Sequence, residues 1–142
     1  MGKKVVNKQR AVLVDTNILS FYLQNREEVV NEFRTLTAAN IKVTAIAAME
    51  ILRKATSKAE LQSLQTFLRS YELLHVTELI STRTMQLIVE YQVSKKLPIL
   101  DAMNAAFALS YDFELWTDNV KDIDYIKGLK LYPVKINREK QK

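Results

Sequence analysis

The sequence contains no cysteine and only one histidine, His75, among its 142 residues. Without cysteine the chain can form neither a disulfide framework nor a thiolate metal site. One histidine is too few for a zinc site built on imidazoles within a single chain, so any bound metal must be held by oxygen ligands. His75 lies in an apolar stretch that predicts a strand, which favours a structural role over that of a general base.

Long apolar runs and chain-breaking residues are also scarce. No apolar run reaches the length of about 18 residues that a membrane span needs, and the basic N-terminus lacks the apolar core of a signal peptide. We therefore expect a cytoplasmic protein without a membrane segment. Only two glycines and two prolines interrupt a chain that is 48% hydrophobic, which favours one globular domain with short loops.

The formal net charge of +5 is concentrated at the two ends of the chain. Residues 1–10 and 135–142 are rich in lysine and arginine, whereas the residues between them are slightly acidic. We divide the chain into a basic N-terminal extension (1–10), a globular domain (11–134) and a basic C-terminal tail (135–142). Basic arms favour a polyanionic partner such as nucleic acid, and the alternative is that they are solvated tails.

Strand-like and helix-like apolar patterns alternate along the chain. Strands are predicted at 11–14, 41–44, 73–76, 115–117 and 129–134, the last at a sheet edge because it contains Pro133. Helices are predicted over 18–23, 27–40, 45–54, 57–68, 82–93 and 101–110. This alternation predicts a three-layer α/β/α fold, in which helices flank a central, mainly parallel sheet of about five strands.

Three acidic residues occupy surroundings that are otherwise apolar. Asp15 follows the first strand, Glu50 lies on the helix after the second, and Asp101 opens an alanine-rich helix. Taken singly, Asp15 and Asp101 can be helix caps and Glu50 can be a surface helix residue. Because right-handed crossovers place the ends of parallel strands on one side of the sheet, we expect the three carboxylates to converge.

A cluster of carboxylates points to a bound divalent cation. Like charges raise one another's pKa and destabilise the fold, and a hard cation removes that cost. Oxygen ligands suit Mg²⁺ or Mn²⁺. Such a metal activates a water and stabilises the leaving oxygen in phosphodiester hydrolysis, and the basic arms would add affinity for a nucleic-acid backbone.

Four segments resemble the motifs of PIN-domain nucleases, and the resemblance runs over residues 11–134. They are 15–17 (Asp-Thr-Asn after a strand), 44–52 around Glu50, 97–106 around Asp101, and 115–123. Within the family the chain is most similar to the VapC-type toxins of bacterial and archaeal toxin–antitoxin pairs. The resemblance implies a Mg²⁺- or Mn²⁺-dependent endoribonuclease with an RNA substrate, usually a homodimer, that a cognate antitoxin holds inactive.

The resemblance also assigns residues. Carried over position by position, it makes Asp15, Glu50 and Asp101 metal-binding catalytic residues. The fourth ligand position falls on Asn119, or on Asp122 acting through a water. Asp118 is a third candidate, although its alternation with the neighbouring threonine predicts that it points elsewhere.

Three further polar residues are expected to position the substrate or organise the site: Thr16, Asn17 and Thr117. The chain departs from the family pattern after Glu50, where it has Ile51-Leu52-Arg53-Lys54 and many members of the subgroup place a glycine. The missing glycine affects the prediction for the loop after this helix and does not affect the Glu50 carboxylate.

Other functions fit the same sequence less well. A PIN-fold scaffold that has lost catalysis would bind RNA or protein, and a PIN nuclease acting in RNA processing would look much like a toxin. A receiver-type signalling domain also uses a parallel sheet with an aspartate after its first strand. It requires an acidic pair there and an aspartate after the third strand, whereas this chain has a lone Asp15 and, at 75–78, His-Val-Thr-Glu.

Overall fold

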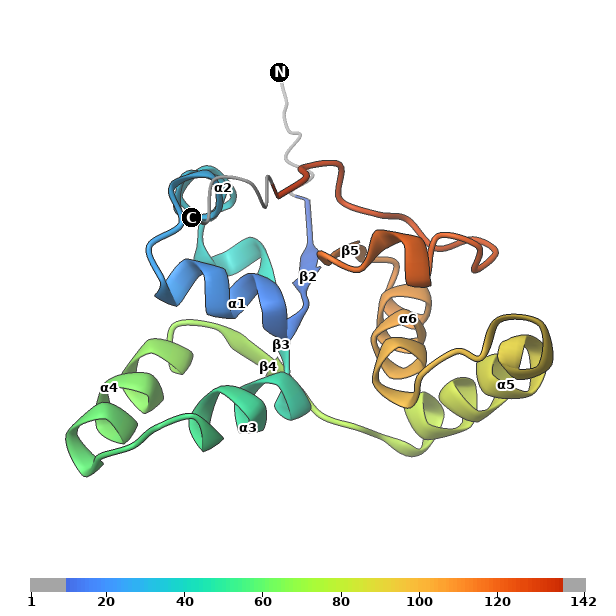
Figure 1. The fold of residues 1–142 in the computed structure, drawn as a ribbon, viewed down its shortest axis with the longest axis horizontal. Helices are drawn as coiled ribbons and strands as arrows, with labels where there is room; N and C mark the ends of the chain where they lie inside the picture. Colours follow the sequence, from blue (N-terminus) through green and yellow to red (C-terminus); the bar gives the residue numbers. More distant parts are fainter. Residues whose placement is uncertain (1–9, 137–142) are drawn as a thin grey trace, which may run out of the picture.

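A sheet of four parallel strands forms the centre of the computed structural model, which describes residues 10–136 (Figure 1). The strands are β2 (Val12–Val14), β3 (Ile41–Thr44), β4 (Glu72–Leu74) and β5 (Glu114–Trp116). They lie in the order β4-β3-β2-β5, and Leu13 in β2 pairs with Lys42 on one side and Leu115 on the other.

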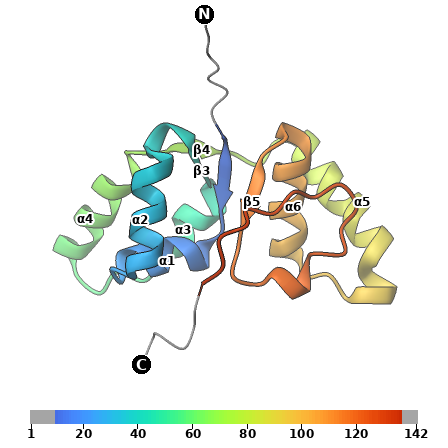
Figure 2. The same cartoon turned by 90° about the horizontal axis from the view of Figure 1, so that it is seen from above.

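Helices cover both faces of this sheet, as Figures 1 and 2 show from two directions. One layer consists of α1 (Thr16–Leu23), α2 (Glu27–Leu36), α3 (Ala45–Arg53) and α4 (Lys58–Leu68). The other layer consists of α5 (Glu78–Lys95) and α6 (Ile99–Tyr111). Two short 3₁₀ helices, η1 (Ala38–Asn40) and η2 (Val120–Asp122), complete the described elements. The predicted three-layer α/β/α class is confirmed.

The strand β2 separates two hydrophobic cores. Successive side chains of a strand point to opposite faces of the sheet. Accordingly, Val12 and Val14 join the core under α1–α4, whereas Leu13 joins the core under α5 and α6, and all three are buried. A strand that is buried on both faces must be apolar throughout, which explains the continuous apolar run at 11–14.

The strand order reverses at β2. After β2 the chain continues through β3 to β4 on one side, and it returns to pair β5 with the other side of β2. The crevice at the carboxyl ends of strands at such a switch point is the usual ligand site of an open α/β sheet. Asp15 directly follows β2, and its backbone N–H donates to the carbonyl of Trp116 at the end of β5 (2.9 Å).

The predicted fifth strand is wrong, so the sheet has four strands and not about five. Within the described residues, segment 129–134 forms only an isolated parallel bridge between Leu131 and Leu115. One hydrogen bond on each side supports this bridge, from Leu115 N–H to Lys130 O and from Tyr132 N–H to Leu115 O, each 2.9 Å. Pro133 follows at once and has no N–H to extend a ladder.

Several predicted boundaries also move. The third strand ends at Leu74, so His75 lies beyond it and is exposed, and its predicted place inside a strand is wrong. The next helix begins at Glu78, four residues before the predicted start, because the Thr77 hydroxyl caps it by accepting from Ile80 N–H (3.2 Å). The helix predicted over 27–40 ends at Leu36, since Thr37 has a positive φ of 68°.

Most of the two predicted basic arms lies outside the described residues. Of the N-terminal extension (1–10) only Arg10 is described, and it forms an ion pair with Glu114 (2.7 Å) and lies 4.8 Å from the centre of the Tyr132 ring. Arg10 therefore packs on the domain. Of the C-terminal tail only Lys135 and Ile136 are described. Among the described helices, none has the length and apolar character needed to cross a membrane.

Candidate active site

A cavity of about 280 Å³ opens at the carboxyl ends of the strands. It brings together side chains that the sequence separates widely, because its walls come from α1, α3, α6 and the turn after β5. Its polar lining residues are Asp15, Thr16, Asn17, Thr44, Glu50, Lys54, Asp101, Asn104 and Asn119. The convergence expected for Asp15, Glu50 and Asp101 is therefore present in this cavity.

The Asp15 carboxylate is held by three hydrogen bonds. Its Oδ1 accepts from the Thr16 backbone N–H (2.7 Å) and from Asn104 Nδ2 (3.3 Å), and its Oδ2 accepts from the Thr117 hydroxyl (2.7 Å). Asp15 is also the N-cap residue of α1, so the structural and functional interpretations of this residue are compatible. A carboxylate oxygen has two lone pairs, and the bonds formed by the described residues leave one of them on Oδ2 for a cation.

Glu50 enters the cavity from the middle of α3. The helix begins at Ala45 because the Thr44 hydroxyl at the end of β3 accepts from Ala47 N–H (3.0 Å). Glu50 lies one and a half turns further on and is partly buried. Its Oε1 accepts from the Thr16 hydroxyl of α1 (2.6 Å), so the residue after Asp15 fixes the second carboxylate.

Asp101 lies in the first turn of α6, whose N-cap is Pro98. The helix begins two residues before the predicted start, so Asp101 is not its capping residue, and the capping interpretation is wrong. Burial first, and then the negative charges of Asp15 and Asp122, raise the pKa of Asp101 from an ordinary 3.8 to about 6. Asp101 is thus a half-buried carboxyl group that other carboxylates surround.

The three candidates for the fourth ligand occupy different places. Asn119 lines the cavity, and its backbone N–H donates to the Thr117 hydroxyl (3.0 Å). Asp118 and Asp122 line a neighbouring hollow of about 690 Å³, which Asn119 borders as well, and Asp122 is exposed. Asn119 is therefore the candidate that shares a cavity with Asp15, while Asp122 approaches from outside it.

Two polar lining residues were missed by sequence reasoning, although the helical repeat could have indicated both. Asn104 lies three residues after Asp101 and Lys54 lies four residues after Glu50, so each shares a helix face with a predicted carboxylate. Asn104 donates to Asp15 Oδ1, and Lys54 donates to Ser20 Oγ (2.8 Å).

The carboxylates share the cavity without forming a complete metal cluster. Among residues 10–136, no three His, Cys, Asp or Glu side chains are arranged so that they could hold one metal ion together. The donor types are nevertheless those of a hard cation, since the cavity offers carboxylate and amide oxygens and neither sulfur nor imidazole.

Comparison with known proteins identifies the family. The family model of the PIN domain matches residues 12–126, and the chain therefore belongs to the PIN domain family. No curated protein matches the chain.

Solved structures share the fold over nearly the whole domain. A toxin–antitoxin complex from Klebsiella pneumoniae contains a chain that is 28% identical, with a TM-score of 0.75 and coverage of 89% of this chain and 100% of that one. DNA-bound VapBC from Salmonella typhimurium matches at 23% identity and a TM-score of 0.74, covering 87% and 98%. VapBC2 from Rickettsia felis, bound to a promoter DNA fragment, also matches at 23% and 0.74, covering 89% and 99%.

Proposed function

We propose that this protein is a Mg²⁺- or Mn²⁺-dependent endoribonuclease and the toxin of a toxin–antitoxin pair, acting in the cytoplasm. One observation supports the proposal most: Asp15, Glu50 and Asp101 reach a single cavity from three separate elements. Three carboxylates in one cavity are costly for a fold unless a cation neutralises them. The raised pKa of Asp101, which comes first from burial and then from the charges of Asp15 and Asp122, is consistent with such a cost.

In this proposal Asp15, Glu50, Asp101 and Asn119 hold the metal, and Asp122 contributes through a water. The metal, when bound, supplies an activated water and neutralises charge on the scissile phosphate. The remaining residues orient these ligands. Thr117 and Asn104 fix both oxygens of Asp15, and Thr16 fixes Glu50.

Three polar residues of the site contact the substrate in this proposal. Asn17 and Thr16 occupy the first turn of α1, where backbone N–H groups point out of the helix and favour a negatively charged group. We assign the two residues, together with Thr117, to positioning the scissile phosphate.

The proposed partners are an antitoxin and a second copy of the chain. The structural match to a toxin–antitoxin complex supports the antitoxin. A row of exposed apolar residues on α5, namely Met85, Val89 and Val93, supports the homodimer, because four-residue spacing places them on one side of the helix.

Cleavage of RNA by the purified protein tests the proposed function. We expect cutting of a mixed cellular RNA pool with Mg²⁺ or Mn²⁺, no cutting with EDTA, and none by Asp15→Ala. Asp112→Ala is the matched control, because Asp112 is an exposed carboxylate at the far end of α6. Cutting that survives in Asp15→Ala, or that needs no metal, would contradict the proposal.

A catalytically inactive PIN scaffold is the second candidate, and one observation favours it. The described carboxylates do not form a set of three that could hold a metal ion in their present arrangement. Calorimetric titration with Mn²⁺ separates the two functions. Binding that Asp101→Asn weakens supports the nuclease, whereas the absence of binding together with the absence of cutting supports the scaffold.

A further inference from the structure

Two polar contacts join α1 to α3 along the edge of the cavity. The Thr16 hydroxyl donates to Glu50 Oε1 (2.6 Å), and Lys54 Nζ donates to Ser20 Oγ (2.8 Å). Thr16 and Ser20 are four residues apart on α1, and Glu50 and Lys54 are four residues apart on the other side. Each pair lies on one face of its helix, so the two contacts are about one helical turn, roughly 5.4 Å, apart.

The contact between Lys54 and Ser20 holds the lysine ammonium group in the cavity that the carboxylates line. Among the described residues, Lys54 is the only lysine or arginine that lines the cavity. A lysine four residues after a glutamate usually serves as its ion-pair partner on a helix surface. Here the ion pairs of residues 10–136 do not include Lys54 with Glu50, and the ammonium is directed to the Ser20 hydroxyl instead.

We propose that Lys54, positioned by Ser20, binds a backbone phosphate of the RNA strand at the rim of the active site. The inference rests on the proposed function for the identity of the substrate. The exposed ammonium carries three donors, and the Ser20 contact uses one of them, so two remain for phosphate oxygens. A phosphate held there lies about one helical turn along the α1–α3 edge from Glu50.

Binding without cleavage tests this proposal. The probe is a fluorescein-labelled single-stranded RNA of mixed sequence, titrated in EDTA at several salt concentrations. We expect Lys54→Gln to weaken binding about fivefold at roughly 0.1 M salt and to reduce the salt slope by about 0.7, the value for one lost phosphate contact. Lys54→Arg should bind like the wild type, and Ser20→Ala should weaken binding less than Lys54→Gln does.

Lys127→Gln is the matched control for the lost charge. Lys127 is exposed and adjoins Gly128, which packs near Leu109, towards the end of α6 that is remote from Asp101. Equal affinities and salt slopes for Lys54→Gln and Lys127→Gln would overturn the proposal, and so would an equal loss in Lys54→Arg and Lys54→Gln. The cleavage test above is independent, because a protein that cuts RNA while Lys54→Gln binds normally keeps its function and loses only this inference.

Discussion

The hydroxyl of Thr117 is a hydrogen-bond centre for two parts of the site. It donates to Asp15 Oδ2 (2.7 Å) and accepts from Asn119 N–H (3.0 Å), and the side chain is buried. A valine at position 117 keeps the shape of the side chain, but the Asp15 carboxylate and the Asn119 N–H lose the hydroxyl as a hydrogen-bond partner. We expect Thr117→Val to lower metal affinity and RNA cleavage by about 10–100-fold, as the loss of a group that orients a metal ligand does.

Thr84→Val is the control for the stability effect of this substitution. Thr84 is equally buried, and its hydroxyl donates to Ile80 O (2.7 Å) within α5. Both variants should lose about 1–3 kcal/mol of unfolding free energy, while Thr84→Val keeps its activity. Urea denaturation and cleavage assays on the two variants measure this. Equal activities of the two variants would show that Thr117 has no role in orienting Asp15.

Asp101 makes the stability of the metal-free protein depend on pH. Its pKa is about 6 in the folded state, above an ordinary 3.8, so between these values the folded state binds more protons than the unfolded state. The contribution of Asp101 to the free energy of unfolding therefore falls as pH rises from about 4 through 6. We expect Asp101→Asn to remove this fall and to exceed the wild type by about 1 kcal/mol at pH 7.5, after allowing for solvent screening of a half-exposed group.

Urea denaturation in EDTA at pH 4.5 and 7.5 measures this difference. Asp112→Asn makes the same substitution at the exposed end of α6, where the carboxylate pairs with Lys130 (2.8 Å). This variant should show no gain that grows with pH. An Asp101→Asn variant that is less stable than the wild type at pH 7.5 would refute the conclusion that the ionised Asp101 carboxylate destabilises the metal-free fold.

The residue that follows α5 has an unfavourable backbone conformation. Lys96 has a φ of 54° and a ψ of 51°, the left-handed conformation that glycine adopts most easily at a helix end, while its N–H still donates to Gln92 O (2.8 Å). We expect Lys96→Gly to raise the free energy of unfolding by about 1 kcal/mol. Glu90→Gly in the middle of the same helix should lower it by about the same amount.

Urea denaturation of the two variants measures these changes in the free energy of unfolding. Both variants replace a charged residue with glycine, Lys96 at the C-cap of α5 and Glu90 within the helix. A gain in stability for Lys96→Gly and a loss for Glu90→Gly would show that the effect follows the backbone conformation of the replaced residue. If Lys96→Gly destabilises the protein as Glu90→Gly does, the Lys96 side chain contributes more to the fold than its backbone strain costs.

Local patterns predicted the convergence of the three carboxylates better than they predicted the sheet. Asp15 and Glu50 follow apolar runs and Asp101 lies in the first turn of a helix, so the sequence marks their positions directly. Their convergence follows from the parallel strands. The fifth strand was predicted from an apolar alternation that is present in the sequence. In the structure only Leu131 of that segment pairs with the sheet, so no strand forms. The contact of Lys54 with Ser20 could not be predicted, since it depends on how α1 and α3 pack against each other across 34 residues.

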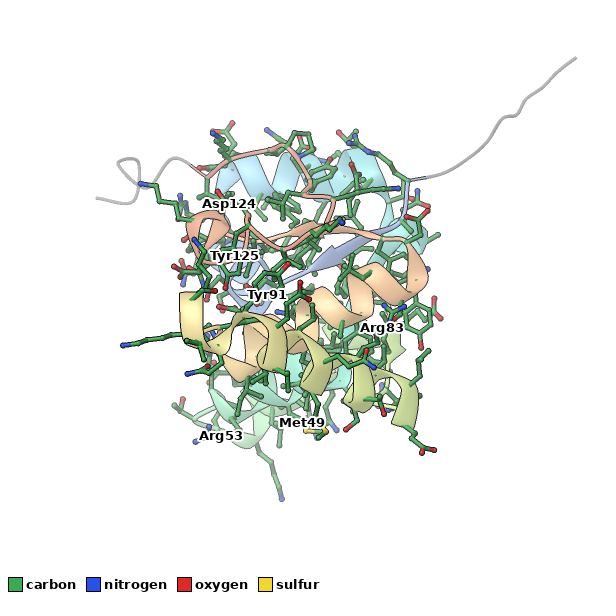
Figure 3. All side chains as sticks on the ribbon, turned by 90° about the vertical axis from the view of Figure 1, so that its right-hand side faces the viewer. Met49, Arg53, Arg83, Tyr91, Asp124 and Tyr125 are labelled. Carbon is green, nitrogen blue, oxygen red and sulfur yellow. The ribbon has the colours of Figure 1, made fainter. Side chains whose placement is uncertain are left out.

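The apolar row on α5 is the surface that supports the proposed homodimer. Met85, Val89 and Val93 are 65%, 82% and 94% exposed, and Figure 3 looks directly onto this helix. We expect Val89→Glu to convert the proposed dimer to a monomer, because a charge at the centre of an apolar contact loses its hydration. Ser94→Glu, which adds a charge at an exposed position on a different side of the same helix, should leave the dimer intact.

Sedimentation velocity at several protein concentrations distinguishes these states. A wild-type protein that sediments as a monomer throughout would contradict the homodimer. Equal dissociation by Ser94→Glu and Val89→Glu would show that the added charge, and not the apolar row, controls the dimer.

The hydrogen bond between Thr117 and Asp15 spans 102 positions of the sequence and links the residues that follow β5 and β2 at the switch point of the sheet. A ribosome adds about 5–20 residues per second, so Asp15 precedes Thr117 by roughly 5–20 s during synthesis. During that interval the nascent chain gains Glu50 and then Asp101, but it still lacks the Thr117 hydroxyl that fixes Asp15. We therefore expect the proposed nuclease site to form only after β5 has been synthesised and has paired with β2.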